Sequence, residues 1–152
     1  MNQTTLVVIK SMGIGDLCIL IANIHAISKS ISRPVVVLAQ KNTHACSILQ
    51  YDPHIEKVID LDKKGFFNVV KKIKPYKIHQ AYIFSDSMRL YLISKLSNIE
   101  QIFHYKFFSK KGKNFFKTAK KFTEKILNTK IESHSKIYCN NNDIEDAKKK
   151  YN

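Results

Sequence analysis

The sequence predicts an α/β protein built on a doubly wound parallel sheet. Short runs rich in Val, Ile and Leu recur five times in the first 105 residues, and segments with helical spacing of apolar residues separate them. This alternation favours parallel strands joined by right-handed crossovers. The 152 residues, of which 44% are apolar, are enough for one domain with a sizeable core.

A pair of glycines separates the first predicted strand from the first predicted helix. Residues 5–10 form a β-branched apolar run, which Gly13 and Gly15 interrupt. Over residues 16–31, apolar side chains recur three and four positions apart, as in an amphipathic helix. The helix ends before Pro34, because the residue before a proline disfavours helical geometry.

The later elements follow the same pattern, and turn residues mark their ends. Asp52-Pro53 closes a short helix, Pro75 stops the next one, and a polar loop at 85–87 follows the fourth strand. The predicted strands are 35–39, 57–61, 79–84, 99–105 and 135–139. The predicted helices are 43–51, 65–73, 88–96, 114–127 and one that starts near Asn142 or Asp143 after a polar linker at 140–142.

The charge is strongly positive and unevenly distributed. Lys and Arg total 26 against 12 Asp and Glu, a net charge of +14, and residues 106–130 hold nine Lys and one acid. Such a field favours an anionic partner, which is a phosphate, a nucleic acid or an acidic membrane surface. A solvated helix face and a general compositional bias toward Lys are the alternatives. Only two basic residues are Arg, which disfavours nucleic acid.

Several classes of protein do not fit the sequence. The chain has no run of about 18 apolar residues to span a membrane, and its start does not resemble a secretory signal. Its three cysteines do not form a disulfide scaffold, and its six histidines lack metal-ligand spacing, so no metal site is expected. We therefore expect a soluble, globular and cytoplasmic protein.

Two loops are candidates for a binding site. In an open parallel sheet, ligands bind beyond the carboxyl ends of the strands. Residues 11–16 follow the first strand and residues 85–89 follow the fourth. The strand order expected for this winding makes these two strands neighbours, so the two loops would line one crevice.

Asp16 is the residue with the sharpest chemical interpretation. It is either an acid that stabilises the start of the helix, or a carboxylate that takes a proton from a bound hydroxyl. The glycines before it do not complete a dinucleotide fingerprint, because Cys18 occupies the third small position and no acid follows residues 35–39. No Gly-Lys-Ser or Gly-Lys-Thr follows them either, so a phosphate-binding P-loop is excluded.

Several segments together resemble one enzyme family. Residues 8–16 read VIKSMGIGD before an apolar helix, which resembles the opening of the family 9 glycosyltransferases, the bacterial heptosyltransferases. Residues 52–62, 80–90 and 99–105 are similar to later parts of the same domain, and the segment from 137 onward is similar to the approach to an interdomain linker. The resemblance implies the N-terminal half of a GT-B enzyme with a Rossmann-like sheet.

The resemblance implies two domains, one that binds the acceptor and one that binds the donor. Residues 1–139 would form the acceptor-side domain and residues 140–152 the start of the linker. The C-terminal domain, absent here, would hold a nucleotide sugar such as ADP-heptose. We expect no other cofactor.

The resemblance also assigns roles to individual residues. Asp16 matches the proposed catalytic base of an inverting sugar transfer that needs no metal. The residues that would face the acceptor are Lys10, Ser11, Gly13, Gly15, Ser85, Asp86, Ser87 and Arg89. Among these, Lys10 and Arg89 would hold anionic groups of a lipopolysaccharide-core-type glycolipid.

The partners and the rival functions follow from the same resemblance. The expected partners are an anionic glycolipid acceptor, the missing donor domain and, through peripheral contact, the cytoplasmic face of the inner membrane. A non-catalytic module that binds an anionic glycan or lipid is the first alternative. A nucleic-acid-binding protein is a weaker one, since the chain carries no recognised binding motif.

Overall fold

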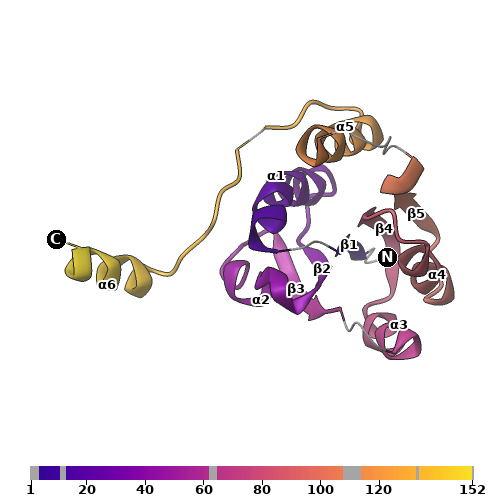
Figure 1. Ribbon diagram of the computed structural model, residues 1–152, viewed down its shortest axis with the longest axis horizontal. Coiled ribbons are helices and arrows are strands. Elements are labelled where there is room, and N and C mark those ends of the chain that lie inside the picture. Colours follow the sequence, from indigo (N-terminus) through magenta and orange to yellow (C-terminus); the bar gives the residue numbers. More distant parts are fainter. Residues whose placement is uncertain (1–3, 11–12, 62–64, 108–113, 133, 152) are drawn as a thin grey trace.

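The computed structural model describes residues 4–10, 13–61, 65–107, 114–132 and 134–151. Its centre is a five-stranded sheet in the order β3-β2-β1-β4-β5, in which each neighbouring pair is parallel (Figure 1). The strands are β1 (Thr4–Ile9), β2 (Val35–Ala39), β3 (Ile55–Asp60), β4 (Ile78–Phe84) and β5 (Gln101–His104). The predicted doubly wound, Rossmann-like parallel sheet is confirmed.

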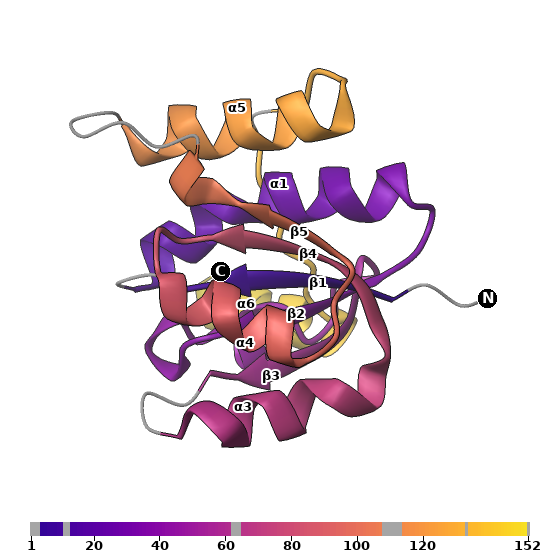
Figure 2. The same cartoon turned by 90° about the vertical axis from the view of Figure 1, so that its right-hand side faces the viewer.

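Helices cover both faces of this sheet. Figure 2 shows α1 and α5 on one face and α3 and α4 on the other. The helices are α1 (Ile14–Ser30), α2 (Ala45–Ile48), α3 (Phe66–Ile73), α4 (Met88–Leu96), α5 (Phe115–Leu127) and α6 (Asn141–Tyr151). Three short 3-10 turns are η1 (Lys41–Thr43), η2 (Lys74–Tyr76) and η3 (Tyr105–Phe107).

Burial on both faces explains the continuous apolar runs of the central strands. In β1, Val7 and Ile9 pack with α1 and α5, whereas Leu6 and Val8 pack with α3 and α4. All four side chains are 0–1% exposed. Parallel strands covered on both faces read as unbroken apolar runs, because neither face contacts water.

The start of α1 differs from the prediction and changes the position of Asp16. The helix begins at Ile14, and its N-cap is Gly13. Asp16 is therefore an acid in the first turn of the helix and does not cap it. Gly13 has an extended backbone, with φ 175, and the apolar spacing alone does not reveal that the helix starts directly after it.

The predicted helix at 43–51 is broken into two short pieces. His44 has φ 53 and separates η1 from α2, which is four residues long. The predicted strand at 135–139 is wrong. Residues 134–140 run in an extended form outside α1, where Ser135 Oγ donates a hydrogen bond to the Cys18 carbonyl. In the described part of the chain these residues pair with no strand of the sheet, so a short apolar run alone does not make a strand.

The final helix starts slightly earlier than predicted, at Asn141. The backbone N–H of Asp143 donates to Asn140 Oδ1 at 2.6 Å, so Asn140 caps the helix. Two of the three residues of the predicted linker therefore belong to α6. Figure 1 shows α6 apart from the sheet, at the end of the extended segment.

Candidate functional site

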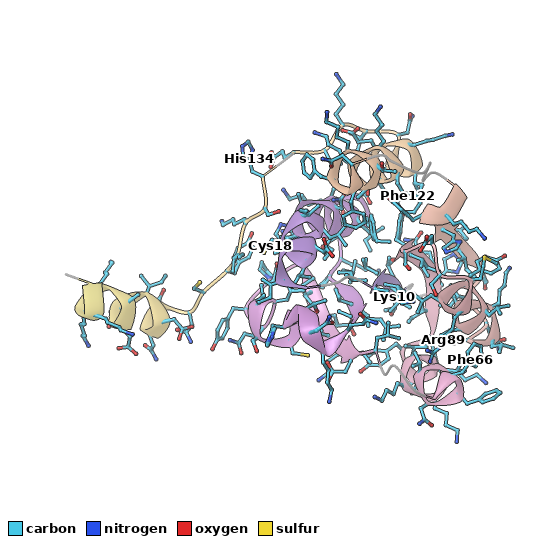
Figure 3. The ribbon with its side chains drawn as sticks, in the orientation of Figure 1. Lys10, Cys18, Phe66, Arg89, Phe122 and His134 are labelled. Carbon is cyan, nitrogen blue, oxygen red and sulfur yellow. The ribbon has the colours of Figure 1, made fainter. Side chains whose placement is uncertain are left out.

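The two predicted loops meet at one edge of the sheet, as expected. β1 and β4 are neighbours, and Ile9 lies opposite Phe84 in their register. Lys10 and Ser85 therefore leave the sheet side by side. Figure 2 shows these strands pointing toward the same edge, and Figure 3 shows Lys10 after β1 and Arg89 on α4.

The described residues leave space beside the start of α1. Lys10 is exposed, and Ser11 lies outside the described residues. A Cβ added at Gly13 or at Gly15 would meet no described atom within 4 Å. The first amide groups of a helix have no partner within that helix, and its N-terminus favours negative charge. Within the described ranges, no atom therefore blocks the approach of a ligand with anionic groups to Gly13 and Gly15.

Asp16 lies half-buried in this first turn. Its side chain is neither enclosed in the core nor fully exposed. This position suits both interpretations of Asp16. The positive end of the helix dipole interacts favourably with a carboxylate, and the same carboxylate can accept a proton from a hydroxyl group placed above it.

The loop after β4 is shaped by its own side chains. Ser85 is buried, and its Oγ accepts a hydrogen bond from the Ser87 backbone N–H at 3.1 Å. Ser87 is the N-cap of α4, and its carbonyl accepts from Leu90 N at 3.1 Å. Asp86 is exposed and Arg89 is half-buried. Ser85 therefore fixes the turn, while Asp86 and Arg89 can contact a ligand.

His104 is a residue of this edge that the sequence analysis missed. It ends β5 opposite Ile83 and is 1% exposed. Burial and the charge of Lys106 lower the pKa of His104, against the opposite influence of the Ser85 backbone. The imidazole is therefore neutral at pH 7, behind the loop 85–87. The only signal in the sequence was a histidine at the end of a predicted strand.

The edge carries charges of both signs. Lys10, Arg89 and the exposed Lys106 supply positive charge, and Asp16 and Asp86 supply negative charge. Among the described residues, no group of three His, Cys, Asp or Glu side chains could hold a metal ion. None of the helices in the described ranges is long and apolar enough to cross a bilayer.

Comparison with known proteins gives no match to a family model or to a curated sequence. Solved structures do match. The family 9 glycosyl transferase of Veillonella parvula has a TM-score of 0.75 at 16% identity, over 99% of this chain and 50% of that one. The E. coli ADP-heptose lipopolysaccharide heptosyltransferase II has a TM-score of 0.56 at 15% identity, over 66% of this chain and 30% of that one.

These likenesses concern the fold, because both identities are low. The chain spans about half the length of the Veillonella protein. The family resemblance expected from the residue motifs thus agrees with the three-dimensional arrangement. This chain has the Rossmann-like fold of a family 9, heptosyltransferase-like glycosyltransferase over half the length of such an enzyme.

Proposed function

We propose that this chain is the acceptor-binding half of a glycosyltransferase that moves a sugar from a nucleotide sugar to a lipopolysaccharide-core-type acceptor. The observation that carries the proposal is the match of 99% of the chain to a family 9 enzyme at a TM-score of 0.75. The meeting of the loops after β1 and β4 at one edge supports it. In this GT-B arrangement, residues 1–139 bind the acceptor and residues 140–152 lead to a donor domain.

The proposed reaction is an inverting transfer. Asp16 accepts the proton of an acceptor hydroxyl while that oxygen attacks the anomeric carbon of the donor sugar. The bond from the anomeric carbon to the nucleoside diphosphate breaks, and the diphosphate leaves with the electron pair. The transition state has oxocarbenium character, as in other reactions at a glycosidic carbon. The half-buried position of Asp16 supports this role.

The other residues of the edge position the acceptor. Lys10 and Arg89 pair with its phosphate or carboxylate groups, and Arg89 can do so through two parallel hydrogen bonds. Ser87 and Asp86 hydrogen-bond to sugar hydroxyls. His104, buried behind the loop, is a positioning residue because it supports the backbone of residues 85–87.

Exposed apolar side chains next to the crevice support contact with a membrane. Met88, Leu92 and Leu96 follow one another at every fourth position of α4 and are 43%, 51% and 51% exposed. Phe67 of the neighbouring α3 is 70% exposed. Lys95 lies on the same helix, and each lysine near an anionic lipid surface contributes about 1 kcal/mol. This face would place the crevice at the cytoplasmic surface of the inner membrane, where a glycolipid acceptor is presented.

Binding of a soluble, anionic core oligosaccharide to this chain tests the acceptor role. We expect Arg89→Gln to weaken binding about tenfold, because a charged hydrogen-bonding partner is lost. Asp16→Asn should leave the affinity within about twofold. Lys121→Gln, an exposed position on α5, is the matched control and should change nothing. Equal weakening by Arg89→Gln and Lys121→Gln would show attraction to the net charge alone and contradict the proposal.

Transfer itself is measured with the chain joined to its donor domain. Asp16→Asn should lower the rate of nucleoside diphosphate release by 10² to 10⁴, which is the usual contribution of a general base. If the oligosaccharide binds but Asp16→Asn transfers sugar at the normal rate, the base assignment is wrong. Binding without any transfer would favour the non-catalytic alternative. Tight binding of RNA or DNA in place of the oligosaccharide would favour the nucleic-acid alternative.

A further inference from the structure

A second concave site lies far from the crevice. An open cavity of about 420 Å³ is lined by the C-terminal half of α1, by His54 and by residues of the segments 129–132 and 134–138. Because α1 runs back along the sheet, this half of the helix lies at the amino edge of the strands. Lys29 is thirteen residues beyond Asp16, or about 20 Å along the helix. The cavity is therefore separate from the acceptor site.

Most of the ionisable side chains in the wall of this cavity are basic. Six of the side chains that line it are basic or can become so, and one is a carboxylate, Glu132. The six are His25, Lys29, His54, Lys130, His134 and Lys136. Figure 3 shows His134 on the extended segment that passes outside α1. A cavity of this size holds a small molecule, and its lining favours an anionic one.

Two partly buried hydrogen bonds of Ser28 fix the position of the proton on neutral His54. Ser28 Oγ donates its single proton to the Arg33 carbonyl at 2.8 Å. At the His54 Nδ1 contact of 3.1 Å, Ser28 Oγ can therefore only accept. Nδ1 thus carries the hydrogen, and the lone pair of neutral His54 is on Nε2. Within the described part of the chain, Nε2 has no hydrogen-bonding partner.

The environment of His54 favours its neutral form when no anion is bound. Burial, followed by the nearby His25 and Lys29, lowers the pKa of His54, while Asp52 acts in the opposite direction. Asp52 is already engaged, since its Oδ2 accepts from His25 Nε2 at 2.6 Å and its Oδ1 from the His54 backbone N–H at 2.9 Å. An anion in the cavity would offset the repulsion from Lys29 and let Nε2 take up a proton and donate it.

The outer wall is held in place at several points. Ser135 Oγ donates to the Cys18 carbonyl, and Asn140 Nδ2 donates to the Tyr51 hydroxyl at 2.8 Å. Between them, the Tyr138 ring packs 5.9 Å from that of His25, and Lys136 Nζ lies 4.7 Å above the Tyr138 ring. The segment is therefore docked on the body of the protein and forms a stable side of the cavity.

We propose that this cavity binds the phosphate group of a small phosphomonoester, with His54 taking up a proton and Lys29, Lys130 and Lys136 pairing with the phosphate oxygens. The site does not depend on the proposed transferase function. Because its ligand would bridge α1 and the segment 129–138, it would also tighten the attachment of the segment that leads to α6.

Titration of the whole chain with inorganic phosphate and with sulfate tests the proposal, with the imidazole NMR signals of His54 and His25 as the readout. Sulfate stays a dianion between pH 5.5 and 8, so any pH dependence of its affinity belongs to the protein. We expect both anions to shift the His54 signals, and sulfate affinity to fall at least fivefold from pH 5.5 to 8.

Variants separate this site from general attraction to a basic protein. Lys29→Gln should weaken phosphate binding about tenfold, while Lys121→Gln on the exposed face of α5 should leave it unchanged. His54→Gln should abolish the pH dependence of sulfate binding, and His134→Gln, an exposed residue of the same wall, should retain most of it. Circular dichroism checks that each variant is folded. If His54→Gln does not fold, Lys29→Gln still tests the proposal.

Three results would overturn the proposal. The first is an absence of shifts at His54 and His25 up to 10 mM phosphate. The second is equal weakening by Lys29→Gln and Lys121→Gln, and the third is a sulfate affinity that does not change with pH in the unmodified chain. Loss of oligosaccharide binding at the crevice, with phosphate binding intact here, would contradict only the acceptor role.

Discussion

Replacement of Gly15 by alanine tests whether a ligand uses the open face of α1. Gly15 is in the first turn of the helix, its φ is not in the left-handed region, and an added Cβ would meet no described atom within 4 Å. Alanine is more favourable than glycine inside a helix by about 0.5–1 kcal/mol. Gly15→Ala should therefore stabilise the protein by up to about 1 kcal/mol in urea unfolding.

The same substitution should harm binding. The methyl group would occupy the space through which an acceptor approaches the helix, so we expect the affinity for the anionic oligosaccharide to fall about tenfold, or about 1.4 kcal/mol. If Gly15 had a purely structural role, the variant would not combine higher stability with weaker binding of the oligosaccharide. Calorimetric titration and urea unfolding of the same preparation measure both quantities.

Gly65→Ala is the matched control, with the opposite expectation. Gly65 has φ 93, and a Cβ there would lie 2.8 Å from Asn68 Nδ2. Left-handed geometry costs a residue with a side chain about 1–2 kcal/mol, so this variant should be destabilised while its affinity for the oligosaccharide stays the same. If Gly15→Ala is stabilised and binds as tightly as the unmodified chain, the acceptor does not approach this face of α1.

Three further predictions concern the core, the pH dependence and the membrane face. Phe122 is 0% exposed, so Phe122→Ala should lower the free energy of unfolding in urea by about 3–5 kcal/mol. The exposed control Phe67→Ala should lower it by less than about 0.5 kcal/mol, and similar losses would show that α5 is not part of the core. The pKa values of His54 and His104 are lowered in the folded protein, so below pH 6.5 the unfolded chain binds protons that the folded chain does not bind. The melting temperature should therefore fall as the pH drops below 6.5, and a constant melting temperature would contradict this. Leu92→Glu should reduce the fraction of protein that sediments with anionic vesicles at least fivefold. The melting temperature should fall by no more than about 2 °C. An unchanged fraction would show that α4 does not contact the membrane.

The central strands were predictable because burial on both faces leaves an unambiguous pattern. The strand at 35–39 and the helix at 88–96 have the predicted bounds. An unbroken β-branched run between turn residues has few alternative structures in a chain of this size. The order of strands followed from the handedness of the crossovers, and it placed β1 beside β4.

The errors occurred where local pattern and tertiary environment disagree. Residues 137–139 form a short apolar run, Ile-Tyr-Cys, yet the segment runs along α1 and is held by single hydrogen bonds to Cys18 and Tyr51. A strand needs a partner edge as well as the right residues. The start of α1 was misplaced because Gly13, a weak helix residue, serves as its N-cap.

The two candidate sites also differ in how far the sequence alone could predict them. The candidate residues of the carboxyl edge could be named from the sequence because they follow strands directly, and their roles stay a prediction. The set formed by His25, Asp52, His54 and Ser28 could not, because His25 and Asp52 are 27 positions apart and their hydrogen bond exists only in the folded protein. His104 was missed for a similar reason, since its neighbours come from a loop on another strand.

The two candidate sites lie at different edges of the sheet and relate differently to the C-terminal segment of the chain. The acceptor site that we propose lies at the carboxyl edge, after β1 and β4, where the described residues leave space beside Gly13 and Gly15. The basic cavity is closed on one side by the segment 129–138, which continues into α6. Occupation of the cavity therefore acts on the path of the chain as it leaves this domain, whereas occupation of the crevice does not. A phosphate ligand that tightens residues 134–140 against α1 would restrict α6 without touching Asp16.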